Sequence, residues 1–118
     1  MEEAERIAVL TRLVEDGSID DERFARRYAE DKRELAGWGP ERIREALGGR
    51  GISEDLIATA LAAESEDEVA ARASVLLARS GIKVADERGR QRALAQLARR
   101  GFPLEAAYDA VRALERNG

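Results

Sequence analysis

The sequence contains no cysteine and no histidine, and these two absences restrict its possible chemistry. Without cysteine the chain has no disulfide framework, no thiolate nucleophile and no cysteine-ligated zinc site. Without histidine it lacks the usual general base and the commonest ligand of transition metals. Any catalysis would have to rely on carboxylates, hydroxyls and guanidinium groups.

Long apolar runs are also absent, because no stretch approaches the about 18 residues that cross a bilayer. The first residues, MEEAERIAV, place no basic leader ahead of an apolar stretch, so no secretory signal is indicated. We therefore expect a cytoplasmic protein that does not associate with membranes.

Basic residues are outnumbered, with 20 against 24 acidic residues and a net charge of −4. That balance argues against a dedicated nucleic-acid coat, whose phosphate contacts need a basic surplus. Only Lys32 and Lys83 are lysines, and the remaining cations are arginines, which suit bidentate pairing with carboxylates or phosphates. A base-composition bias in the genome is the simpler explanation for this preference.

Aromatic residues and proline are scarce, whereas alanine and leucine are frequent, which is a helical composition. Apolar residues recur at spacings of three and four, and no segment has the alternation of a strand. We therefore predict an all-α protein of about seven helices. Their predicted positions are residues 2–16, then helices starting near Asp20, Pro40, Ser53 and Ser65, one from Glu87 to Arg100, and one starting at Pro103.

Helical spacing also predicts side-chain positions within the second predicted helix and after it. Phe24, Tyr28 and Leu35 form the predicted buried face of that helix. Trp38 lies between two glycines, and we expect it to pack in the core beside Pro40, across the start of the next helix. An exposed position that anchors a partner is the alternative.

A short pattern occurs twice, since LGGRGISEDLIATAL is followed fifty residues later by LARRGFPLEAAYDAV. Arg50 thereby returns as Arg100, and Gly51 returns as Gly101. Left-handed caps and helix-end cations explain each position separately, but not their common order. A period of about 45–50 residues indicates stacked three-helix units in an elongated array. The expected divisions are 1–17 (the last helix of a truncated first repeat), 18–63 and 64–118.

Several short motifs resemble the RecX family of recombination regulators. They are IDDERFA at 19–25, RELAGWGP at 33–40 and IREALGGRGI at 43–52. The second RGF, at 100–102, and the run RQRALAQLARR that leads into it resemble the third repeat of that family. The resemblance covers nearly the whole chain.

This resemblance implies tandem three-helix repeats that bind the filament of the RecA recombinase. Members of the family modulate RecA, mostly by inhibiting its ATPase, strand-exchange and coprotease activities, and some also bind DNA. Family members usually carry three full repeats, of which this chain is expected to hold the last two and the final helix of the first. We expect it to act as a monomer.

Carboxylates gather at Asp20, Asp21 and Glu22 and again over residues 64–68, where they could hold magnesium or form an acid–base pair. Both groups lie at predicted helix starts, where capping and the helix dipole already favour acidic residues. The stretch GWGP at 37–40 lacks the spacing and the Lys-Ser/Thr pair of a phosphate-binding loop. We predict a protein without catalytic residues, metal or cofactor.

Arginines on the helices that precede the two turns are the predicted partner-binding residues. Solvated faces with helical salt bridges explain the arginines beside Glu41 and Glu45, but less well those after Glu87, which have few acidic neighbours. We predict that these arginines contact the RecA filament or the DNA within it. They are Arg42, Arg44, Arg50, Arg88, Arg90, Arg92, Arg99 and Arg100.

A small helical DNA-binding module, acting without RecA on single- or double-stranded DNA, is the alternative function. Residues 42–61 and 92–111 each pair two helices around a glycine turn, as in helix-turn-helix proteins. The second helix of the first pair would start with Glu54 and Asp55, which DNA phosphates would repel. Reading of the major groove is therefore disfavoured.

Overall fold

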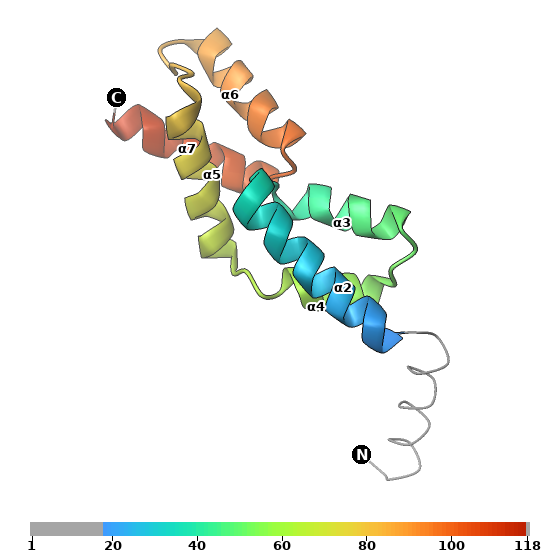
Figure 1. Ribbon diagram of the computed structural model, residues 1–118. Helices are drawn as coiled ribbons and strands as arrows, with labels where there is room; N and C mark the ends of the chain where they lie inside the picture. Colours follow the sequence, from blue (N-terminus) through green and yellow to red (C-terminus); the bar gives the residue numbers. More distant parts are fainter. Residues whose placement is uncertain (1–17, 118) are drawn as a thin grey trace.

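A computed structural model of the protein describes residues 18–117, and all of the secondary structure in that range is helical (Figure 1). The prediction of an all-α fold is thus confirmed. The helix predicted at 2–16 lies outside the described residues. The elements are α2 (Ser18–Asp31), the π-helix η1 (Lys32–Ala36), α3 (Pro40–Gly49), α4 (Glu54–Leu61), α5 (Glu66–Ser80), α6 (Glu87–Arg99) and α7 (Leu104–Asn117).

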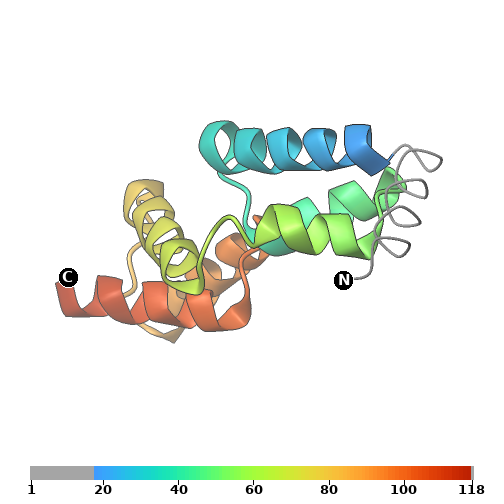
Figure 2. The ribbon, with the colours of Figure 1, turned by 90° about the horizontal axis from the view of Figure 1, so that it is seen from below.

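The helices form two three-helix units, which we call the N-terminal unit (α2 to α4, with η1) and the C-terminal unit (α5 to α7). The two units lie side by side along the molecule in both views (Figures 1 and 2). Each encloses its own apolar core, as in tandem helical repeats. The first core contains Ala25, Ala29, Ile43, Leu47, Ile52, Ile57 and Ala60, and the second Val69, Ala73, Leu77, Ala93, Leu97, Phe102, Ala106, Ala107, Ala110 and Val111. We therefore propose the division between residues 63 and 64.

The repeated pattern forms the same turn in both units. The backbone N–H of Ile52 donates to Leu47 over 3.1 Å, and the N–H of Phe102 donates to Leu97 over 3.0 Å. The glycine between them is left-handed each time, with φ of 84° and 94°. Both glycines are therefore helix caps, because that region is costly for a residue with a Cβ.

A capping box forms the start of α5, at the helix start predicted near Ser65. The Ser65 hydroxyl accepts from the Glu68 N–H over 3.1 Å, and the Glu68 carboxylate accepts from the Ser65 N–H over 3.0 Å. The pKa of Glu68 is lowered mainly because the Ser65 backbone N–H donates to its ionised carboxylate, and the Ser65 side chain lowers it further. Residues 82–86 separate α5 from α6.

The predicted buried face of α2 is wrong at Leu35, whose surface is 83% exposed, and at Phe24, which is 40% exposed. Tyr28 is half-buried, so the predicted burial is met only in part there. At Leu35 the reason is the π-helical turn of η1, whose wider repeat shifts the residues after Asp31 out of the 3.6-residue register. Leu35 therefore faces solvent, and the half-buried Trp38 packs against the first core instead.

Candidate functional site

A row of three aromatic rings lies along the N-terminal unit. Phe24 and Tyr28 are one helical turn apart on α2, and their ring centroids are 5.6 Å apart. Trp38, in the linker after η1, continues the row with its ring edge toward Tyr28 at 6.3 Å. Trp38 packs beside the start of α3, which agrees with the expected core position, although it is only half-buried.

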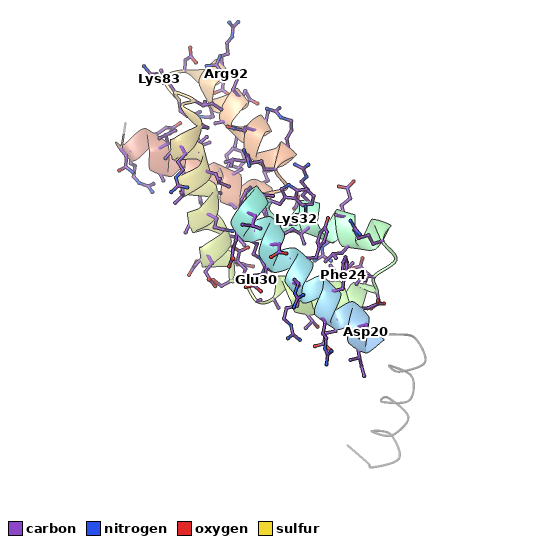
Figure 3. The ribbon with its side chains drawn as sticks, in the orientation of Figure 1. Asp20, Phe24, Glu30, Lys32, Lys83 and Arg92 are labelled. Atoms are coloured by element: carbon purple, nitrogen blue, oxygen red, sulfur yellow. The ribbon has the colours of Figure 1, made fainter. Side chains whose placement is uncertain are left out.

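Three cations cover the faces of these rings. The ammonium of Lys32 lies 4.6 Å from the Trp38 centroid, and the guanidinium of Arg42 lies 4.2 Å from it. Arg50 lies 5.1 Å from the Tyr28 ring and 5.5 Å from the Phe24 ring. Cations within about 6 Å of a ring are attracted by its quadrupole. Lys32, Arg42 and Arg50 therefore have favourable positions on these rings. We call these three the cationic row (Figure 3 labels Lys32 and Phe24).

The cationic row ends at the place where the two units meet, which we call the unit junction. Here the linker of the N-terminal unit pairs with the turn of the C-terminal unit. The N–H of Gly39 donates to the carbonyl of Arg100 over 2.7 Å, and the N–H of Glu41 donates to that of Gly101 over 2.9 Å. A Cβ on Gly39 would lie 2.6 Å from the Phe102 nitrogen, so only glycine permits this approach.

A largely buried ion cluster of Arg33, Glu64 and Arg72 reinforces the unit junction. Arg72 of α5 pairs with the Glu64 carboxylate and donates to the Trp38 carbonyl over 2.9 Å. Arg33 of η1 lies 3.5 Å from the same carboxylate and donates to the Ala60 carbonyl over 2.7 Å. One carboxylate thus holds two cations that come from different units.

Two of the predicted partner-binding arginines are engaged in ion pairs. Arg44 pairs with Glu54 over 3.0 Å, and Arg90 pairs with Glu115 over 2.6 Å and with Glu87 over 3.2 Å. The Glu115 carboxylate raises the pKa of Arg90, mainly through their hydrogen bond and further through its charge. The expectation that Arg90 has few acidic neighbours is wrong, because α7 brings Glu115 to it from 25 residues away.

The other predicted arginines are distributed over three places. Arg42 and Arg50 belong to the cationic row, and Arg100 donates to the Ala36 carbonyl across the unit junction over 3.3 Å. Arg88, Arg92 and Arg99 are exposed on α6 and form no ion pair within residues 18–117. Figure 3 shows Arg92 and Lys83 toward one end of the molecule, away from Phe24 and Asp20. The eight residues are therefore spread over both units and the unit junction.

Sequence reasoning missed Lys32 and the three residues of the ion cluster. Lys32 could have been found from its position four residues after Tyr28, which predicts a cation over that ring. Arg72 carries a weaker signal, since it stands between Ala71 and Ala73 in an apolar part of α5. No local sequence pattern predicts which residues pair with Glu64, because these ion pairs depend on how the units pack.

Neither a metal-ligand cluster nor a membrane-spanning helix occurs in the part of the chain that the structure describes. Within residues 18–117 no three histidine, cysteine, aspartate or glutamate side chains are grouped so that they could hold a metal ion. None of the helices in that range is both long and apolar enough to cross a bilayer.

The fold and the turn geometry define the chain as a tandem array of three-helix units, and comparisons with known proteins identify its family. Residues 20–61 match the domain described as "RecX, second three-helix domain". Proteins named "Regulatory protein RecX" align over most of the chain. That of Pseudomonas entomophila is 39% identical over 98 residues, or 81% of this chain and 62% of that protein. That of Mycobacterium marinum is 34% identical over 107 residues, or 87% of this chain and 62% of that protein.

A third relative, the RecX of Leuconostoc citreum, is 36% identical over 109 residues, or 89% of this chain and 40% of that protein. The chain belongs to the RecX family. It spans at most about three-fifths of the length of the relatives named here.

Proposed function

We propose that this chain is a regulatory protein that binds the filament of the RecA recombinase in the cytoplasm and mostly inhibits its activities. Membership of a family whose relatives are named regulatory proteins supports the regulatory role. The observation that carries the binding proposal is the cationic row, which is already ordered by the aromatic rings beside the unit junction. We expect no enzymatic activity of the chain itself.

The cationic row suits an anionic protein or nucleoprotein surface. Binding normally costs the rotamer freedom of long side chains, about 0.5–1.5 kcal/mol for each one that is immobilised. Stacking on Trp38 and Tyr28 has already restricted Arg42 and Arg50, so less freedom remains to be lost. Guanidinium groups can then form bidentate bonds to carboxylates or phosphates. Arg92 and Arg99 offer a second, separate contact on α6.

Charge reversal tests this assignment. Arg42→Glu with Arg50→Glu, and separately Arg92→Glu with Arg99→Glu, should weaken inhibition of the RecA ATPase at least tenfold. Arg23→Glu on α2 serves as the control. Circular dichroism would verify folding. Unchanged inhibition by both double variants, with folding intact, would rule out these arginines as the contact.

DNA binding without RecA remains the second candidate, favoured by the alternation of rings and cations, which is typical of single-strand-binding surfaces. Against it, the rings of Trp38 and Tyr28 are covered by the cationic row, so a base could stack there only after displacing a cation. Binding to single-stranded DNA, with and without RecA over a salt series, distinguishes the two functions. Tight binding without RecA and a steep salt slope would favour the DNA-binding module.

A further inference from the structure

A groove opens between η1 of the N-terminal unit and α5 of the C-terminal unit. Its volume is about 590 Å³, within the usual range for ligand sites, about 300–1,000 Å³. Its walls come from both units, and Arg100 of the repeated turn closes one side. The groove contains none of the aromatic rings described above.

This groove also carries two exposed apolar side chains, one from each unit. Leu35 is 83% exposed and Val75 is 48% exposed, and both line the groove. Neither belongs to an apolar core of the described residues. The π-helical turn is what presents Leu35 here, and π-helical segments are rare and frequent at functional sites. The core therefore does not account for these two side chains.

The groove is strongly cationic although the chain as a whole has a net charge of −4. Four arginines and only one acidic residue, Glu34, line it. Two of these arginines, Arg33 and Arg72, are ion-paired with Glu64, which neutralises part of their charge. The other two arginines, Arg79 and Arg100, form no ion pair within residues 18–117.

We propose that this groove binds an acidic segment of the protein partner, with apolar side chains covering Leu35 and Val75 and carboxylates pairing with Arg79 and Arg100. This inference rests on the proposed function, because it takes the RecA protein as that partner. Charge complementarity selects an anion, and guanidinium groups pair well with carboxylates. The exposed Leu35 and Val75 favour a peptide over a nucleic-acid backbone, whose phosphates and sugars offer no apolar side chain to cover them.

An occupied groove would also stabilise the arrangement of the two units. Leu35 and Val75 come from different units, so one bound segment contacts both. Binding would add to the contacts made by Arg72 and Gly39 at the unit junction. The bound chain should accordingly resist separation of its units more than the free chain.

Two variants with matched controls test the groove. Leu35→Ser with Arg79→Glu should weaken co-sedimentation with RecA filaments more than tenfold, and both side chains are exposed, so the fold should persist. The control, Leu104→Ser with Arg27→Glu, changes an exposed leucine and an exposed arginine on α7 and α2, outside the groove. It should bind as the native chain does. Equal binding by the groove variant and the native chain would overturn the inference.

A photo-crosslink identifies the occupant. Benzoylphenylalanine in place of Leu35 in the full chain, irradiated with RecA filaments on single-stranded DNA, should crosslink to a RecA segment rich in carboxylates and apolar residues. Crosslinks to the DNA, or none while the chain co-sediments with the filament, would overturn the inference. No co-sedimentation of the native chain would refute the proposed function itself, a distinct outcome.

Discussion

Removing the charge of Glu64 tests whether the ion cluster holds the two units together. In the change Glu64→Gln the side chain keeps its volume and one carbonyl oxygen, but Arg33 and Arg72 lose the carboxylate that neutralises them. The side chains of Glu64, Arg33 and Arg72 are 8%, 12% and 23% exposed, so water replaces the lost carboxylate poorly.

The expected loss follows from this burial. Breaking a buried ion pair by removing one partner costs about 3–5 kcal/mol, because an uncompensated charge remains. Partial access of water to Arg72 places the expected loss at the lower end of that range, about 3 kcal/mol. Proteins have a total stability of only about 5–15 kcal/mol, so the loss should lower the midpoint of thermal unfolding by about 10 °C or more.

A double-mutant cycle separates the pair from its surroundings. Urea unfolding of the native chain, Glu64→Gln, Arg72→Met and the double variant gives the coupling energy, which we expect to be about 2 kcal/mol. Trp38 fluorescence is a suitable signal, since the Trp38 carbonyl accepts from Arg72. The control is Glu22→Gln, whose partner Arg26 is on the exposed face of α2 and which should cost less than about 1 kcal/mol.

Two results would refute the reasoning. One is a loss below about 1 kcal/mol for Glu64→Gln, which would equal an exposed pair. The other is a coupling energy near zero between Glu64 and Arg72. A fall in the denaturant slope of the Glu64→Gln variant would instead support it, because separately unfolding units expose less surface per transition.

Two further predictions concern the turns and the capping box. In urea unfolding, Gly101→Ala should cost about 3 kcal/mol or more of stability and Gly51→Ala about 1–2 kcal/mol. Both positions need a left-handed φ, but only at Gly101 would the new Cβ meet the Arg42 backbone. Equal losses would refute the docking of that turn. The pKa of Glu68 is lowered on folding, so its ionised carboxylate stabilises the fold and Glu68→Gln should reduce the thermal midpoint above pH 4.5. The difference from the native chain should shrink as pH falls below that value. A pH-independent difference would show that the charge is not involved.

Local signals predicted most of the fold. Glycine, proline and Ser65 marked the helix boundaries because caps and turns depend on neighbouring residues. Helical spacing matches the core where a helix keeps its 3.6-residue period, as for Ala73 and Leu77 in α5. It failed at Leu35, because one π-helical turn changes the register and the composition of residues 32–36 gives no warning of it.

The candidate site was less predictable because its contacts join residues far apart in the sequence. Arg100 reaches the Ala36 carbonyl across 64 positions, and Arg72 reaches that of Trp38 across 34. Helical spacing indicates which face of a helix carries an arginine, but not which element packs against that face. The predicted binding role of the arginines stays a prediction, with Arg90 now the weakest candidate because Glu115 occupies it.

The two copies of the repeated turn show that the same short pattern can make different contacts in the two units. Both copies share two internal hydrogen bonds, yet Gly101 is packed against Arg42 whereas Gly51 is exposed with no atom near its missing side chain. The arginines before them differ in the same way, since Arg50 covers aromatic rings and Arg100 crosses the unit junction. The pattern therefore encodes the turn, and its surroundings decide what the turn contacts. Arg50 thus belongs to the cationic row and Arg100 lines the groove, although both stand at the same position of the pattern.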